Sequence, residues 1–132
     1  MPNKYIVIGT FDYDVYDHLK DRLCNDDAQV TLVQSGSKLL LELLDNKVDL
    51  LILDLDVTGV LGIEILPVIR RLRPRLPIIL ITDDMNAKIR KIAAEMGVTY
   101  QTYKPMSNAE TQAIATATER LLDRQLFEFA ML

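Results

Sequence analysis

The chain has 132 residues, of which 49% are apolar and 26% are charged, and its net charge at pH 7 is −4. These values predict one soluble globular domain with a substantial hydrophobic core, and they exclude nucleic acid as a default partner. The single cysteine excludes an internal disulfide. The sequence has no signal-peptide pattern, and none of its apolar runs approaches the ~18 residues of a membrane span. We therefore expect a cytoplasmic protein that binds no membrane.

Five short apolar runs along the chain are predicted to be strands. The third and fourth, "LLILD" and "IILIT", are apolar up to their last residue. Strands buried on both faces have this pattern, as in parallel sheets covered by helices on each side. The five predicted strands are Lys4–Gly9, Gln29–Val33, Leu50–Asp54, Ile78–Thr82 and Val98–Lys104.

A stretch with the apolar spacing of an amphipathic helix follows each predicted strand. Polar caps, glycine and proline mark where these helices begin and end. The predicted caps are Asp12 or Asp14, Ser37 and Ser107, and the predicted ends are Asp45-Asn46, Arg73-Pro74 and Gly97.

The resulting order, a strand followed by a helix five times over, predicts an α/β fold with a (βα)5 doubly wound parallel sheet. In such sheets a ligand binds beyond the carboxyl ends of the strands, near the switch in winding. For the strand order 2-1-3-4-5, that crevice gathers the residues that end strands 1, 3, 4 and 5. These residues are Gly9-Thr10, Asp54, Thr82 and Lys104.

Three of these residues form a chemically coherent group. An ionised Asp54 at the end of an apolar strand needs an opposite charge nearby, and Lys104 can supply it. Thr82 adds a hydroxyl that can donate to an oxyanion. A carboxylate, an ammonium and a hydroxyl at one rim suit acceptance of a phosphoryl group on the carboxylate. The alternative is an ordinary buried ion pair beside a threonine.

The chain resembles the response-regulator receiver domains, which have the flavodoxin-like CheY fold. The segments that carry the resemblance are "VDLLILDLDVTGVLG", "LPIILITDD", the glycine of "AAEMGVTY", and "YKP". It covers roughly residues 3–126, so residues 1–126 would form the receiver domain and 127–132 an apolar extension of its last helix.

The resemblance implies a non-enzymatic signalling domain of a two-component phosphorelay. By it, Asp54 accepts phosphate from a histidine kinase or phosphotransfer protein, Thr82 is the switch hydroxyl and Lys104 contacts the phosphate. It also implies a cis peptide bond between Lys104 and Pro105. A downstream protein would bind the surface Asn86–Phe129, and a homodimer through this surface is an alternative.

The acidic pocket departs from the family pattern. Members place two acidic residues directly after strand 1, where they hold Mg²⁺, but this chain has Gly9 and Thr10 there. Asp54 and the backbone carbonyl of Asp56 alone make a thin site, so we expect Mg²⁺ to bind weakly or not at all. Asp12 is the candidate replacement ligand. Further departures are Asp83 after the threonine, Gln101 in place of an aromatic residue, and Thr58 in place of a proline.

Three functions therefore compete. The favoured one is an atypical receiver, or pseudo-receiver, with weakened Mg²⁺-dependent phosphorylation that acts through protein–protein interaction. The second is a conventional phosphoaspartate switch in which Asp12 replaces the acidic pair. The third, a flavin or nucleotide carrier, is disfavoured because "GTFDYDVYD" offers one glycine and three acids where a phosphate cradle is needed.

Overall fold

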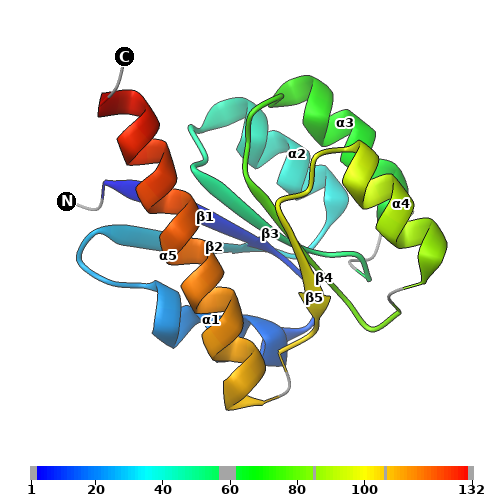
Figure 1. The fold of residues 1–132 in the computed structure, drawn as a ribbon, viewed down its shortest axis with the longest axis horizontal. Helices are drawn as coiled ribbons and strands as arrows, with labels where there is room; N and C mark the ends of the chain where they lie inside the picture. The colour runs from blue at the N-terminus through cyan, green and yellow to red at the C-terminus, as the bar shows by residue number, and fades with distance from the viewer. Residues whose placement is uncertain (1–2, 57–61, 85, 106, 131–132) are drawn as a thin grey trace.

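The computed structural model describes residues 3–56, 62–84, 86–105 and 107–130 of the chain. Its sheet has five parallel strands in the order β2-β1-β3-β4-β5. This arrangement, shown in Figure 1, confirms the predicted doubly wound α/β architecture and its strand order. The strands are β1 (Lys4–Gly9), β2 (Ala28–Val33), β3 (Leu50–Asp54), β4 (Ile78–Thr82) and β5 (Tyr100–Tyr103).

Helices cover both faces of this sheet. Helices α1 and α5 pack on one face, and α2, α3 and α4 pack on the other (Figure 1). No helix within the described part of the chain is long and apolar enough to cross a membrane. The helices are α1 (Tyr13–Leu23), α2 (Gly36–Asp45), the 3-10 turn η1 (Gly62–Glu64), α3 (Ile65–Leu72), α4 (Ala87–Glu95) and α5 (Asn108–Ala130).

The central strand β3 explains the two-sided core. Successive strand residues point to opposite faces of a sheet. Leu51 and Leu53 accordingly pack in the cluster under α2, α3 and α4, whereas Leu50 and Ile52 pack in the cluster under α1 and α5. Strand β4 divides its residues between the clusters in the same way. All five positions of each of these two strands are buried, and the four apolar residues that precede the last position predict this.

The helix starts follow the predicted capping residues with one exception. Asp12 caps α1, and the Ser107 hydroxyl accepts a hydrogen bond from an amide in the first turn of α5. The prediction of Ser37 for α2 was wrong. Ser35 is the cap, and its hydroxyl accepts a hydrogen bond from the amide of Lys38 at 3.2 Å. Both serines flank the same glycine, and only the backbone conformation distinguishes which one caps the helix.

Arg70, near the end of α3, ties α3 to the carboxyl-terminal end of α4. Its guanidinium donates hydrogen bonds to the carbonyl oxygens of Met96 at 2.5 Å, Leu76 at 2.6 Å and Gly97 at 2.9 Å. Gly97 has a φ of 69°, a conformation that favours glycine, and it follows the end of α4 as predicted. The side chain therefore holds together the segments that lead out of α3 and α4.

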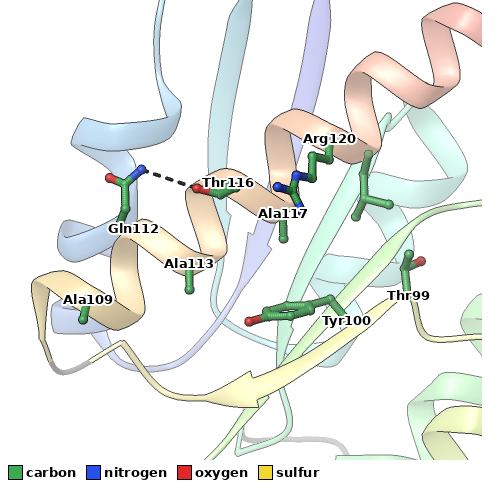
Figure 2. Close-up of a pocket in the computed structure, with 9 residues that line it drawn as sticks. Thr99, Tyr100, Ala109, Gln112, Ala113, Thr116, Ala117 and Arg120 are labelled. Carbon is green, nitrogen blue, oxygen red and sulfur yellow. Dashed lines mark hydrogen bonds between the residues drawn. The ribbon is translucent and has the colours of Figure 1, made fainter.

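Strand β5 is shorter than the predicted range Val98–Lys104. Its first residue is Tyr100, because the amide of Val98 donates to the carbonyl of Ala93 at 2.9 Å in the turn that closes α4. Lys104 has already left the sheet. In the strand order β5 lies at the edge of the sheet. A groove of about 560 Å³ lies beside it, where Tyr100 faces the Ala109, Ala113 and Ala117 side of α5 (Figure 2).

The predicted departure at Thr58 and the last two residues, 131–132, lie outside the described residues.

Candidate functional site

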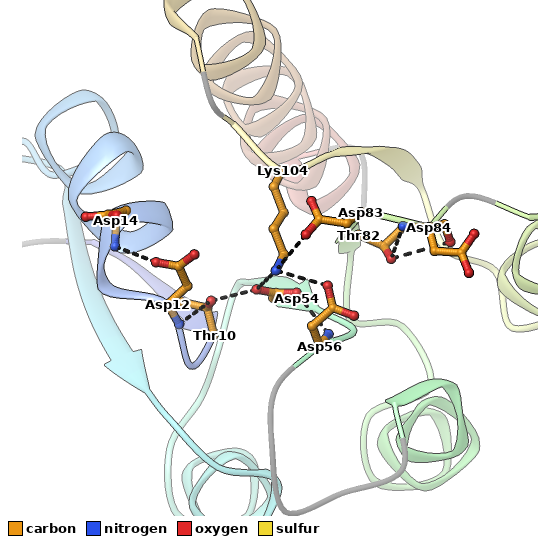
Figure 3. Close-up of polar contacts among 9 residues, drawn as sticks. All are labelled: Thr10, Asp12, Asp14, Asp54, Asp56, Thr82, Asp83, Asp84 and Lys104. Atoms are coloured by element: carbon orange, nitrogen blue, oxygen red, sulfur yellow. Dashed lines mark hydrogen bonds and ion pairs between the residues drawn. The ribbon is translucent and has the colours of Figure 1, made fainter.

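The carboxyl ends of the strands gather the predicted site residues at one rim of the sheet (Figure 3). Asp54 ends β3, which lies between β1 and β4, and its side chain is 1% exposed. The register pairs Gly9 of β1 with Leu53 of β3, so Thr10 and Asp54 follow neighbouring positions. Lys104 follows β5 and reaches back over the rim toward Asp54 (Figure 3).

Both carboxylate oxygens of Asp54 have hydrogen-bond donors. The backbone amide of Asp56 donates to Oδ1 at 2.9 Å, and the hydroxyl of Thr10 donates to Oδ2 at 2.7 Å. Burial raises the pKa of the Asp54 carboxyl above its ordinary value, and these two hydrogen bonds together with the Lys104 charge oppose that rise only in part. Burial thus disfavours the ionised form of Asp54, even though both of its carboxylate oxygens accept hydrogen bonds.

Lys104 lies among three carboxylates. Its Nζ is 3.5 Å from Oδ2 of Asp54, 3.0 Å from Oδ2 of Asp56 and 3.4 Å from Oδ2 of Asp83. The lysine side chain is 11% exposed, and burial by itself lowers its pKa, but the hydrogen bond to Asp56 and the three negative charges outweigh burial and raise the pKa above 10.5. The ammonium is therefore charged throughout the physiological pH range.

Thr10 has a contact that sequence reasoning did not assign. The predicted rim included Thr10, but only as a residue without a carboxylate. In the structure its side chain is fully buried, and its hydroxyl both donates to Asp54 and accepts a hydrogen bond from the amide of Asp12 at 3.1 Å. The signal that locates this contact is the parallel register of β1 and β3, because the residues after paired strand positions lie side by side.

Thr82 ends β4 at the same rim and is 1% exposed, but its hydroxyl is directed to a different partner. Oγ1 accepts a hydrogen bond from the amide of Asp84 at 3.1 Å and lies 3.5 Å from the carbonyl oxygen of Asp84. Figure 3 shows this side chain on the side of Asp83 that faces away from Asp54. The structure thus brings Asp54 and Lys104 together, whereas the Thr82 hydroxyl is hydrogen-bonded to the loop after β4.

The amide of Asp12 contacts Thr10, but the carboxylate of Asp12 caps helix α1. Oδ1 accepts a hydrogen bond from the amide of Asp14 at 2.9 Å, as an N-cap residue does. The carboxylate of Asp56 contacts Lys104. Across the described ranges, no group of three or more His, Cys, Asp or Glu side chains is arranged to hold a metal ion.

One other prediction about the rim has a clear outcome. The peptide bonds of the described residues include no cis bond, so the predicted cis bond before Pro105 was wrong. Gln101, which replaces an aromatic residue, is half-buried in β5 and lines a second groove of about 390 Å³ with Arg90 and Tyr103.

Comparison with known proteins connects this site to a family. A model of the response regulator receiver domain family matches residues 12–116 of the chain. The matched region includes Asp54, Thr82 and Lys104, and it begins beyond Gly9 and Thr10. No significant match was found among curated protein sequences.

Many solved structures have the same fold. A CheY-like response regulator receiver domain from Methanospirillum hungatei JF-1 has a TM-score of 0.84 and 21% identity over 95% of this chain and 98% of that one. The signal receiver domain of an HD domain-containing protein from Pseudomonas fluorescens Pf-5 has a TM-score of 0.84 and 21% identity over 100% and 96% of the two chains. The receiver domain of a putative LuxO repressor from Vibrio parahaemolyticus has a TM-score of 0.85 and 16% identity over 98% and 97%.

Proposed function

Because the chain belongs to the response regulator receiver domain family, we propose that it is an atypical receiver with weakened Mg²⁺-dependent phosphorylation at Asp54. In this proposal the domain acts within a two-component phosphorelay chiefly by binding other proteins. The observation that carries the proposal is the hydrogen bond of 2.7 Å from Thr10 to Asp54. A hydroxyl donor stands where the family pattern supplies a metal-binding carboxylate.

The donor set fits Mg²⁺ poorly. This ion takes oxygen ligands in octahedral geometry and usually binds one or two carboxylates. Oδ1 and Oδ2 of Asp54 already accept hydrogen bonds from Asp56 and Thr10, and the Asp56 carboxylate is 3.0 Å from the Lys104 ammonium. Asp12, the other carboxylate in the neighbourhood, caps α1. A cation at Oδ2 of Asp54 would have to bind beside the Thr10 hydroxyl and the Lys104 ammonium, and one at Oδ2 of Asp56 would meet the same ammonium.

Phosphoryl transfer to Asp54 also meets unfavourable charge. In such a transfer the carboxylate attacks phosphorus, and the charge on the phosphoryl oxygens needs compensation. Three carboxylates, Asp54, Asp56 and Asp83, surround the single ammonium of Lys104. An incoming phosphate donor, itself an anion, faces a net negative pocket. We therefore expect slow modification even where the donor can enter.

The proposed output is protein binding through the face made by α4, β5 and α5. Strand β5 lies at the edge of the sheet, and grooves lined by Tyr100 and by Gln101 lie on either side of it. Tyr103 at the end of this strand is 52% exposed. The partners in this proposal are a histidine kinase or phosphotransfer protein upstream and a protein target downstream, in the cytoplasm, with a homodimer as the alternative occupant of the face.

Treatment with acetyl phosphate, and separately with beryllofluoride, in the presence and absence of Mg²⁺ tests the proposal. Intact-mass spectrometry would follow the acetyl phosphate adduct, and NMR spectra would follow beryllofluoride binding. We expect a small fraction of Asp54 to be modified. Asp54→Asn is the control that identifies the modified residue. Stoichiometric, Mg²⁺-dependent modification that is lost in Asp54→Asn would contradict the proposal and restore the conventional switch.

A further inference from the structure

The Lys104 ammonium contacts carboxylates from three different positions of the chain. Asp54 ends β3, Asp56 lies in the loop after β3, and Asp83 lies in the loop after β4. All three contact atoms lie between 3.0 and 3.5 Å from Nζ. The ammonium is hydrogen-bonded to Asp56 and forms ion pairs with Asp54 and Asp83 as well.

We propose that Lys104 is the resident cation of this pocket and that it excludes Mg²⁺ and Ca²⁺ by holding the carboxylates that would bind them. The proposal rests on the receiver-domain site described above and names what controls cation binding there. In this arrangement the lysine balances the charge of Asp54 and connects the loops after β3 and β4. A divalent ion would otherwise perform both tasks.

The geometry separates this role from that of an ordinary surface ion pair. Asp83 and Asp56 are 69% and 48% exposed, and pairs between exposed groups contribute little by themselves. Lys104 and Asp54, however, are 11% and 1% exposed. A charged group that is so little hydrated requires its counter-charges to be fixed close to it. The two exposed carboxylates are therefore arranged around a desolvated cation.

The charge of the lysine opposes the binding of a second cation at these oxygens. Mg²⁺ binds oxygen at about 2.0–2.1 Å and Ca²⁺ at about 2.3–2.6 Å, so a bound ion would lie within a few ångströms of the ammonium and be repelled by it. Thr10 adds to the exclusion, because its hydroxyl donates to Oδ2 of Asp54. Removal of the lysine removes the repulsion, and the exposed side chains of Asp56 and Asp83 can then move toward an ion.

The test is a titration of Lys104→Met with MgCl2 and with CaCl2, followed by calorimetry and by amide NMR shifts of Asp56 and Asp83. The matched control is Lys47→Met, which removes the same charge from an exposed residue three positions before β3, at the opposite end of that strand. NaCl at equal ionic strength controls for screening. We expect Lys104→Met to bind at least one of the two ions about tenfold more tightly than the unmodified protein, and Lys47→Met to behave as the unmodified protein does.

Equal affinity in the unmodified protein and in folded Lys104→Met would overturn the proposal. If Lys104→Met does not fold, the titration of the unmodified protein tests the proposal by itself. Saturable, Mg²⁺-specific shifts at Asp56 and Asp83 would overturn the resident-cation role, and shifts that NaCl reproduces would support it. The titration uses no phosphate donor. Efficient phosphorylation of Asp54 would therefore contradict the proposed weak switch without deciding the outcome of the titration.

Discussion

The hydroxyl of Thr10 donates a hydrogen bond of 2.7 Å to Oδ2 of Asp54, and both side chains are at most 1% exposed. A hydrogen bond to a buried carboxylate stabilises its ionised form. The contact therefore works against burial, which raises the pKa of Asp54. It also occupies one lone pair of the Asp54 oxygen that lies 3.5 Å from Nζ of Lys104.

Thr10→Val tests the weight of this contact, because valine keeps the shape of threonine and loses the hydroxyl. We expect the pKa of Asp54 to rise further, since the lost hydrogen bond stabilised the ionised carboxylate and such bonds to charged groups contribute about 1.5–3 kcal/mol. The measurement is an NMR titration of the Asp54 carboxyl carbon. Thr116→Val, on α5, is the matched control and should leave this pKa unchanged. A pKa that does not move in Thr10→Val would mean that Lys104 and the Asp56 amide alone set it.

Asp83→Asn should make Asp54 easier to modify. The change removes a negative charge that lies 3.4 Å from Lys104 and leaves the lysine freer to contact an incoming phosphate. Because Asp83 is 69% exposed, the effect is moderate, about 1 kcal/mol or a fewfold faster modification. The rate of adduct formation with acetyl phosphate, followed by mass spectrometry, gives the answer. Asp84→Asn removes an equal charge from the next residue and should have a smaller effect; equal rates in the two variants would argue against a specific role of Asp83.

Lys104→Met should destabilise the fold in a pH-dependent way. The variant leaves Asp54 buried without its counter-charge, and we expect a loss of about 1–3 kcal/mol in the free energy of unfolding near neutral pH. Because the pKa of Lys104 is raised in the folded protein, its contribution is fully present below pH 10.5 and is lost as the pH rises through the folded value.

The loss should also shrink at low pH. The pKa of Asp54 is raised above 3.8, so the carboxyl becomes neutral as the pH falls through that raised value and no longer needs the lysine. Urea unfolding of both proteins across the acidic, neutral and alkaline ranges measures the difference. A difference that is constant with pH would show that the lysine contributes by packing rather than by charge.

Restoring the two acids one at a time should give opposite results. A Cβ at Gly9 would lie 3.3 Å from a methyl carbon of Leu53 and 3.7 Å from methyl carbons of Leu39 and Val33, so Gly9→Asp places a carboxylate against apolar side chains. We expect it to cost about 3 kcal/mol of stability and to add no Mg²⁺ affinity.

Thr10→Asp instead places a carboxylate beside Asp54, because the side chain of residue 10 already contacts Asp54. We expect Mg²⁺ affinity to increase about tenfold over that of the unmodified protein, as measured by calorimetry. An unchanged affinity in Thr10→Asp together with an increased affinity in Gly9→Asp would contradict the contact between residue 10 and Asp54.

The fold and the position of the site could be predicted from the sequence because both follow from regular backbone structure. Apolar runs of strand length indicate which segments enter the sheet, and the carboxyl ends of parallel strands meet at one rim. Asp54 and Lys104 were therefore expected to lie together, and Nζ of Lys104 lies 3.5 Å from Oδ2 of Asp54. The response regulator receiver family was also recognisable from the segments around these residues, and the family match confirms it.

The details that could not be predicted depend on side-chain rotamers and loop conformation. Thr82 lies at the rim, but its hydroxyl accepts a hydrogen bond from the amide of Asp84 in the loop after β4. Asp83 was identified as an acidic departure, yet its contact with Lys104 depends on the direction that this loop takes. The partner of the Thr10 hydroxyl was not predicted, because the family pattern indicates only that this position lacks a carboxylate.

The hydrogen bonds of Arg70 have a consequence for movement near the site. They fix the carboxyl-terminal end of α4 to the end of α3 and to the segment that enters β4. The amino-terminal end of the same helix follows the loop that carries Asp83, which contacts Lys104. If that loop is displaced, α4 would therefore rotate about its anchored carboxyl-terminal end. The displacement would be largest at its amino-terminal end, which lies nearest the acidic rim.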